Sequence, residues 1–361
     1  MSARSALALV AAMIVPLAMA PAARAAPVGR DFVGVTAEDV FAGDASYRTH
    51  NLEAQSALGI GLLRQTFDWA QIERAPGQYD LSYHDAYVLA AASHGMTILP
   101  ILFDAPAFHA RPSNGTAACP PSNNASLAAY AQALVRRYGP GGTLWAERPD
   151  IAPLPIRSWQ IWNEPNLRVY WCNRPSARQY VAMLRTVGTA IKRVDPGAQI
   201  VTAGLPDSKL SGTMPLRRFI DQMYRGGAAR YFDSLGINSY ARDHRELGRM
   251  LAAVRKQMNA RRDRRGRIWI TEIGWGDRGP KHRYVVGEKG QATRIAQSLA
   301  LIRRQRDRLR LRGVVYFCWR DAPPYAPNFK DMWGLHTGLL DINGQPKQSF
   351  DVFGRQLQAL R

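Results

Sequence analysis

Short apolar runs, rich in β-branched and aromatic residues, alternate along this chain with longer segments of helical periodicity. Eight of the runs are typical of strands, and they cover residues 31–35, 61–65, 96–103, 156–162, 199–203, 234–239, 268–271 and 314–319. Helical patterns between them include residues 125–138, 177–194, 216–225, 245–259 and 291–308. The strand-like runs are apolar on both faces, as expected for a parallel sheet covered by helices.

Strands that alternate with helices eight times form a (β/α)8 barrel, and a chain of 361 residues is long enough for one. We therefore predict an α/β fold, a single (β/α)8 TIM barrel. A doubly wound open sheet is the alternative, but no glycine-rich phosphate loop follows the first strand-like run. No repeat, low-complexity tract or linker divides the chain, so residues 26–361 are predicted to form one domain.

Residues 1–25 have the features of a secretory signal peptide. Arg4 gives a positive start, residues 5–20 are almost wholly apolar, and Ala23 and Ala25 provide a small-x-small cleavage site. A membrane anchor is the alternative, but the apolar run contains Pro16 and is shorter than the roughly 20 apolar residues that a span needs. We therefore predict a secreted mature chain with no membrane span.

The three cysteines are too few for a disulfide scaffold. Cys119 and Cys172 fall in segments with loop composition, whereas Cys318 lies in an apolar run and is expected to be buried and inert. Export makes a bridge possible, and we predict a disulfide between Cys119 and Cys172. Two free thiols are the alternative.

Two glutamates fall at the C-terminal ends of predicted strands, the end of a barrel where chemistry takes place. Glu164 follows the fourth strand in Trp-Asn-Glu-Pro-Asn, and Glu272 follows the seventh in Ile-Thr-Glu-Ile-Gly-Trp. The fourth and seventh strands face one another across a closed barrel, so the two carboxylates are expected to converge. Such a pair suits cleavage of a glycosidic bond, because one acid donates a proton to the leaving oxygen while the other attacks or activates water.

These two motifs resemble the paired signature of clan A glycoside hydrolases, most closely families 39 and 5. The resemblance extends to residues 77–80, 338–341 and 344–347 and so covers nearly the whole mature chain. It also includes Leu63, Arg64, Trp69, Ile72 and Glu73 after the second strand. It implies a secreted retaining glycosidase that acts on an extracellular glycan by double displacement, with Glu164 as acid/base and Glu272 as nucleophile.

The resemblance also implies roles for three neighbours of the glutamates. Asn163 would hydrogen-bond the 2-hydroxyl of the reacting sugar. Arg64 would keep the nucleophile ionised, since a nearby cation favours the carboxylate, although a structural ion pair on the barrel rim is its alternative. Tyr240, at the end of the sixth strand, would hydrogen-bond the nucleophile.

Further candidates for sugar contact carry weaker signals. Trp319, after the eighth strand, matches the aromatic platform under the sugar, with core packing as the alternative. Trp275 is a second aromatic candidate, and Asp104 and His109 are candidates for hydrogen bonds to outer hydroxyls. Many clan members carry His where this chain has Asn238, so its contact with the reacting sugar is expected to differ.

No metal or other cofactor is expected, because the histidines are scattered without ligand spacing and no Cys-x-x-Cys pair occurs. The Gly-x-Ser-x-Gly and Walker loops are also missing from the sequence, so serine-hydrolase and nucleotide chemistry have no support.

The chain has 48 Lys and Arg against 28 Asp and Glu, a net charge of +20, which alone would suggest a polyanionic partner. Basic clusters at residues 255–267 and 303–312 precede the seventh and eighth strands and are therefore expected opposite the glutamates. We predict no nucleic-acid partner and a weak attachment to an anionic cell-envelope polymer; an arginine-rich composition without a binding role is the alternative. The rival to catalysis is a barrel that only binds such a polymer through its basic face.

Overall fold

Eight parallel strands close into a barrel in the computed structural model, which describes residues 27–112, 118–172, 174–324 and 330–361. Around the barrel the order is β1-β10-β9-β8-β7-β6-β5-β2. The bounds are β1 Val33–Thr36, β2 Leu62–Asp68, β5 Thr97–Phe103, β6 Ser158–Ile161, β7 Gln199–Thr202, β8 Ser234–Asn238, β9 Arg267–Ile273 and β10 Leu311–Phe317. Each overlaps one of the eight predicted runs, so the single (β/α)8 barrel is confirmed. The predicted signal peptide lies outside the described residues.

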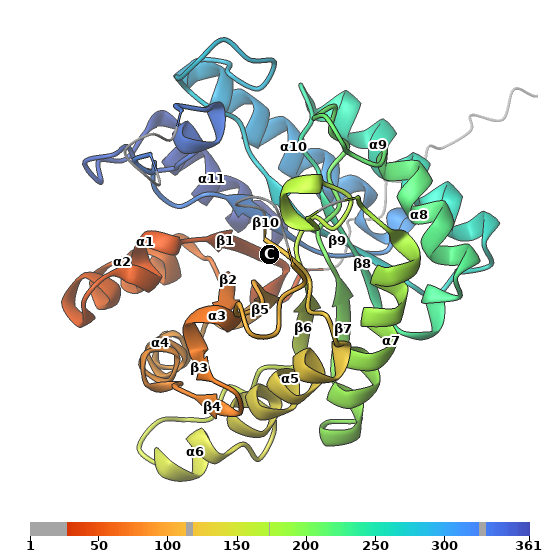
Figure 1. The fold of residues 1–361 in the computed structure, drawn as a ribbon. Coiled ribbons are helices and arrows are strands. Elements are labelled where there is room, and N and C mark those ends of the chain that lie inside the picture. The colour runs from red at the N-terminus through yellow and green to blue at the C-terminus, as the bar shows by residue number, and fades with distance from the viewer. Residues whose placement is uncertain (1–26, 113–117, 173, 325–329) are drawn as a thin grey trace, which may run out of the picture.

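Helices surround the strands on the outside of the barrel (Figure 1). They are α1 Glu38–Ala42, α2 Ala45–Leu58, α3 Trp69–Ile72, α4 Ser82–Ser93, α5 Asn124–Tyr138, α6 Thr143–Glu147, α7 Ala177–Val194, α8 Leu216–Arg225, α9 His244–Ala260, α10 Glu288–Leu309 and α11 Gln348–Leu360. A small hairpin of β3 (Glu73–Ala75) and β4 (Gln78–Tyr79) follows α3 and was not predicted. Among the described residues, no helix is both long and apolar enough to cross a membrane.

Two sets of apolar side chains form the core because strand side chains alternate between the two faces of the barrel wall. The larger set packs between the strands and the helices. The smaller set fills the barrel interior and consists of Leu62, Leu99, Val201, Trp269 and Val315. Residues two positions further along a strand face the same interior, nearer to its C-terminal mouth. Arg64 on β2 and Phe317 on β10 therefore point into the mouth.

Strand β9 carries one extra residue where it reaches the mouth. Ile270 pairs with Ile237 of β8, yet the next pair joins Glu272 to Asn238, and a shift at the same place separates β9 from β10. A β-bulge of this kind re-aims side chains locally. Both Thr271 and Glu272 consequently contact groups at the mouth, although strict alternation would send one of them outward.

All three cysteines are buried, and no disulfide bond joins them in this structure. The thiols of Cys119 and Cys172 are nevertheless hydrogen-bonded to each other, so the predicted bridge stays a prediction. Cys318 is buried as expected, with its thiol hydrogen bond directed to the carbonyl of Arg320 at 3.0 Å.

A buried ammonium group joins the last two loops at the mouth to the start of α11. Lys347 Nζ lies 2.7 Å from a carboxylate oxygen of Asp277, which follows β9, and 2.7 Å from one of Asp321, which follows β10. The side chains of all three residues are at most 7% exposed. The backbone N–H of Gly338 also donates to Asp321, at 2.8 Å. The ion triad therefore fixes the loops that flank Glu272.

We predict that Lys347→Met lowers the free energy of unfolding by about 3–5 kcal/mol, because it leaves the buried carboxylate of Asp321 without its cation and leaves Asp277 with the more exposed Arg278 alone. Urea unfolding at pH 7 measures this loss, with Lys289→Met on the exposed surface of α10 as the control. The loss shrinks at low pH, where Asp321 becomes protonated, since burial raises the pKa of this carboxyl group. An equal effect of the two substitutions would contradict a structural role for the triad.

Candidate active site

Arg64 is the central cation of the site, and its side chain is 2% exposed. Its Nη1 lies 2.8 Å from Oε1 of Glu272, and its Nη2 donates to Oδ1 of Asn163 at 3.1 Å. Its Nε donates to Oε1 of Gln160 at 2.9 Å. One planar guanidinium thus connects β2, the end of β6 and the end of β9, and brings Arg64, Asn163 and Glu272 together as the sequence predicted.

The turn that carries Glu164 leaves β6 in an unusual backbone conformation. Trp162 and Glu164 have positive φ values of 70° and 44°, a region that costs non-glycine residues of order 1–3 kcal/mol each. The turn is held by the backbone N–H of Trp162, which donates to the Leu102 carbonyl, and that of Glu164, which donates to the Gly204 carbonyl. Held strain of this kind is common at functional sites.

Asn238 is the hydrogen-bond partner of Glu164. Its Nδ2 donates to Oε1 of Glu164 at 2.6 Å, and its Oδ1 accepts from the hydroxyl of Thr271 at 2.8 Å. Gly204 makes room for this pair, because a Cβ there would lie 2.1 Å from Oδ1 of Asn238 and 2.6 Å from Oγ1 of Thr271. Asn238 therefore contacts the carboxyl group of Glu164 directly.

The two glutamates have different electrostatic surroundings. Burial, together with the negative charge of nearby Glu272, raises the pKa of Glu164 to about 8, against the opposing effects of Asn238 and Arg64. Glu272 instead has the Arg64 guanidinium in direct contact. One carboxyl group is thus kept protonated at neutral pH beside a second that is paired with a cation, which is the arrangement that acid catalysis and nucleophilic attack require.

Tyr240 donates its hydroxyl proton to Oε2 of Glu272, as predicted from the sequence. Burial and the adjacent carboxylate raise the pKa of Tyr240 well above its ordinary value, so the group remains a donor. The Tyr240 ring packs edge-on against Trp333, with 4.9 Å between ring centroids, and its carbonyl accepts from the hydroxyl of Tyr284 at 3.0 Å. Loops after β9 and β10 therefore hold this tyrosine in place.

The structure corrects two of the predicted sugar contacts. Trp319 and Trp275 are both fully buried. The Trp319 indole donates to Oδ1 of Asn51 at 2.9 Å, and the Trp275 indole donates to the carbonyl of Ala241 at 2.7 Å. Neither ring offers a face to a ligand, so the role of sugar platform is wrong for Trp319 and direct sugar contact is wrong for Trp275. Both residues lie beyond the barrel strands, where alternation no longer decides side-chain direction.

Three further residues of the mouth were not among the candidates predicted from the sequence. Phe317, the last residue of β10, is partly exposed and takes the inward position that had been assigned to Trp319. Gln160, a buried amide within an otherwise apolar strand, orients Arg64, and its polarity in such a strand was a usable signal. Glu38, just after β1, is exposed and accepts hydrogen bonds from Gln65 at 2.6 Å and Thr66 at 3.2 Å. No sequence pattern distinguished it.

Asp104 and His109, the candidates for outer contacts, have different surroundings. Asp104 lines a cavity of about 350 Å³ beside the loop after β5, and burial and neighbouring Asp68 raise its pKa to about 6. His109 instead packs on Trp69, and its ring lies 3.2 Å from the buried carboxylate of Glu73. Neither Glu164 nor Glu272 lines this cavity. Asp104 is thus available for a ligand, whereas His109 is occupied by packing within the protein.

Over the described stretches of chain, no three His, Cys, Asp or Glu side chains are placed to hold a metal ion.

Comparisons with solved structures find the same barrel. A family 39 glycoside hydrolase from Bacteroides cellulosilyticus WH2 superposes with a TM-score of 0.65 and 20% identity, over 90% of this chain and 63% of that one. A GH39 enzyme from Xanthomonas axonopodis pv. citri gives 0.67 and 17%, over 92% and 67%. A GH5_18 enzyme from Streptomyces cattleya, solved with Manβ1-4GlcNAc, gives 0.67 and 16%, over 91% and 80%.

These likenesses establish the fold that the chain shares with families 39 and 5 of the glycoside hydrolases. The chain spans just under two thirds of the length of the Bacteroides structure. No protein-family profile matches the sequence, and no curated protein resembles it significantly. Arguments about activity consequently rest on the site itself.

We predict that Asn238→Leu raises the pKa of Glu164 by about one unit, because it removes a donor that stabilises the charged carboxylate. Titration of 13C-labelled glutamate carboxyl groups by NMR measures the shift, with the signal assigned by its loss in Glu164→Gln. Asn51→Leu is the matched control, since Asn51 is also buried but bonds Trp319 rather than either glutamate. An unchanged midpoint in Asn238→Leu would show that the hydrogen bond does not influence Glu164.

Proposed function

We propose that the chain is a retaining glycoside hydrolase in which Glu272 is the nucleophile and Glu164 the acid/base. The observation that carries the proposal is the asymmetry of the pair. Glu272 accepts hydrogen bonds from Arg64 and Tyr240. The pKa of Glu164 is raised to about 8, and among the described side chains its carboxyl group accepts a hydrogen bond from the uncharged amide of Asn238. A barrel that merely binds a polymer has no need to bury two acids side by side, because their mutual repulsion is unfavourable.

In the first step, a carboxylate oxygen of Glu272 attacks the anomeric carbon as the bond from that carbon to the leaving oxygen breaks. Glu164 gives its proton to the leaving oxygen, so the departing sugar or aglycone is released as a neutral alcohol. Arg64 and Tyr240 hold the attacking carboxylate in one orientation. Because Glu164 must be protonated, the rate of this step is expected to fall as the pH rises through about 8.

In the second step, ionised Glu164 takes a proton from water, and the oxygen of that water attacks the anomeric carbon. The bond from the sugar to Glu272 breaks, and Glu272 is regenerated as a carboxylate. Two displacements at one carbon give net retention of configuration. Asn238 suits the second step, since its N–H group stabilises the charged form of Glu164 that this step requires.

The substrate we propose is a glycan whose reacting sugar enters the barrel mouth. Asn163 is held by Arg64 next to Glu164 and is placed to hydrogen-bond the 2-hydroxyl. The inward ring of Phe317 supplies an apolar face for the sugar in place of Trp319. The exposed carboxylate of Glu38 is available to accept hydrogen bonds from further hydroxyls. We also propose, from the features of residues 1–25, that the enzyme acts outside the cell.

We predict that Glu272→Ala lowers kcat by about 10⁴-fold or more, since it removes the nucleophile. Glu164→Ala is expected to lose about 10²–10⁴-fold with poor leaving groups and much less with dinitrophenyl glycosides, which need no acid. Hydrolysis of a panel of aryl glycosides and oligosaccharides measures both effects, and NMR of the first product gives its configuration. Glu53→Gln, on the exposed face of α2, is the control.

Azide separates the two roles in the same assay. It is expected to form an inverted glycosyl azide with Glu272→Ala and a retained one with Glu164→Ala, because it replaces the missing group on opposite faces of the sugar. Initial product of inverted configuration from the unmodified enzyme would falsify the double displacement. Undiminished activity in Glu272→Ala would exclude Glu272 as the nucleophile.

We propose a second role, attachment to an anionic polymer, for the N-terminal end of the barrel. Six exposed arginines, here called the arginine face, surround the entries to β9 and β10: Arg262, Arg264, Arg265, Arg267, Arg308 and Arg310. In the described part of the chain, none of the six pairs with a carboxylate. Arg310 donates to the carbonyl of Arg265 at 3.2 Å, which brings the two turns together although they are 45 residues apart.

The composition of the arginine face favours a phosphate- or carboxylate-bearing polymer over a nucleic acid or a membrane. The large apolar residues that the described chain exposes are Tyr83, Phe108, Val169, Leu210, Met332 and Ile342. None belongs to the arginine face, so aromatic platforms for bases and apolar anchors for lipid are missing there. Unpaired guanidinium groups remain, and these bind phosphate and carboxylate oxygens in a bidentate manner.

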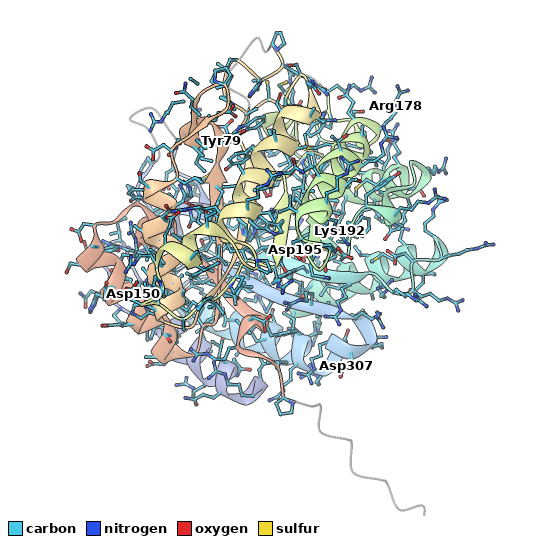
Figure 2. The ribbon with its side chains drawn as sticks, turned by 90° about the horizontal axis from the view of Figure 1, so that it is seen from below. Tyr79, Asp150, Arg178, Lys192, Asp195 and Asp307 are labelled. Carbon is cyan, nitrogen blue, oxygen red and sulfur yellow. The ribbon has the colours of Figure 1, made fainter. Side chains whose placement is uncertain are left out.

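We predict that replacing Arg264, Arg265, Arg308 and Arg310 together by Gln weakens binding to polyphosphate about tenfold or more at low salt. Added salt is expected to weaken the binding of polyphosphate to the unmodified protein to a similar degree. The control removes the same charge from α5 and α7, at Arg136, Arg178, Arg185 and Arg193. Arg178 on α7 and Asp307, next to Arg308, lie well apart in Figure 2. Equal loss in both variants, or tighter binding of single-stranded DNA, would contradict the proposal.

A further inference from the structure

Two loops that flank Glu164 contact each other beside the mouth. The described residues of the loop after β5 are 104–112 and 118–123, and those of the loop after β6 are 162–172 and 174–176. The backbone N–H of Ala118 donates to the carbonyl of Val169 at 3.1 Å, which joins them directly. Arg111 of the first loop donates to Oε1 of Gln179 at 2.6 Å, and the same oxygen accepts from the indole of Trp171 in the second loop. These contacts join the described parts of the two loops into one wall.

Cys119 and Cys172 meet within this wall. Their exposures are 5% and 2%, and the two thiols are hydrogen-bonded to each other. Cys172 follows Glu164 by eight residues and adopts a positive φ of 38°. This hydrogen bond places the two sulfur atoms next to each other, as a disulfide between them requires.

We propose that Cys119 and Cys172 form a disulfide bond that staples the wall beside Glu164 and supports binding of the outer part of the substrate. The effect on the substrate rests on the proposed glycosidase function, whereas the bond itself does not. Glu164 has its own contacts to Gly204 and Asn238, so the staple is expected to act on the wall rather than on the acid.

The bond forms by thiol–disulfide exchange with a small-molecule disulfide or a protein oxidant of the same chemistry. One thiolate attacks a sulfur of the oxidant and gives a mixed disulfide, and the second thiolate displaces the remaining half. Both cysteines lose a proton, two electrons pass to the oxidant, and the oxidant leaves as two thiols. A new Cys119–Cys172 bond replaces the bond that the oxidant brought.

The surroundings of the pair favour bond formation during folding. Burial and the hydrogen bond with Cys119 raise the pKa of Cys172 to about 12, so little thiolate exists in the folded protein at neutral pH. Thiolate is the reacting species, and exchange is therefore slow once the wall has closed. The same burial protects the finished bond from reductants.

The first test is the mass of the protein after folding with a mixture of oxidised and reduced glutathione. The protein is then denatured in N-ethylmaleimide without added reductant. We expect one adduct, on Cys318, and a linked Cys119–Cys172 peptide that a phosphine reductant separates. Three adducts after folding under this oxidant would overturn the proposal, and this readout needs no enzyme activity.

The second test compares the oxidised protein with Cys119→Ser/Cys172→Ser. A bridge across this loop is expected to raise Tm by about 5 °C. With an oligosaccharide substrate the double variant is expected to raise KM about threefold while kcat changes little. Cys318→Ser is the matched control, because it removes another buried thiol outside the wall and leaves the bridge intact. A linked peptide without any change in Tm or KM would show that the bond has no stapling role.

Discussion

Burial of the Arg64 guanidinium is the constraint on which the rest of the site depends. A buried cation is tolerated only when its donors are matched by acceptors. Glu272, Asn163 and Gln160 provide these acceptors from two other strands or their ends. Because the guanidinium is planar and rigid, all three acceptors must lie in a narrow range of positions. The barrel register and the turn around Asn163 are therefore fixed by one side chain, and the orientation of Glu272 follows.

The asymmetry between the two glutamates follows from where that cation is used. Arg64 contacts Glu272, and only its longer-range charge reaches Glu164. Glu164 is left with Asn238, which donates one hydrogen bond but carries no charge. A protonated histidine at that position would lower the pKa of Glu164 further. An amide at this position, in place of a charged group, thus helps to keep Glu164 protonated at neutral pH.

The fold and the centre of the site could be predicted from the sequence for a shared reason. Eight apolar runs define the barrel, and residues at strand ends converge because parallel strands end at one mouth. This convergence accounts for the meeting of Glu164 and Glu272, whereas the contacts of Arg64, Asn163 and Tyr240 were expected from the family resemblance. The predicted sugar contacts of Trp319 and Trp275 were wrong because both residues follow the last residue of their strand, where local turns decide the direction of the side chain. The inward position of Phe317 depends on where strand β10 ends. The contacts that both Thr271 and Glu272 make at the mouth depend on a β-bulge. Composition reveals neither feature.

The net charge of +20 and the raised pKa of Glu164 are compatible because of distance and screening. Strand β2 has seven residues, so the arginine face and the mouth lie about 20 Å apart along the barrel. That separation is about two Debye lengths at physiological salt, and the positive charges at one end have little influence on a carboxyl group at the other. The pKa of Glu164 is raised mainly by burial and by the charge of Glu272, against the opposing effects of Asn238 and Arg64. The two ends of the barrel can therefore serve different partners, since changing the charge of one leaves the proton equilibrium of the other in place.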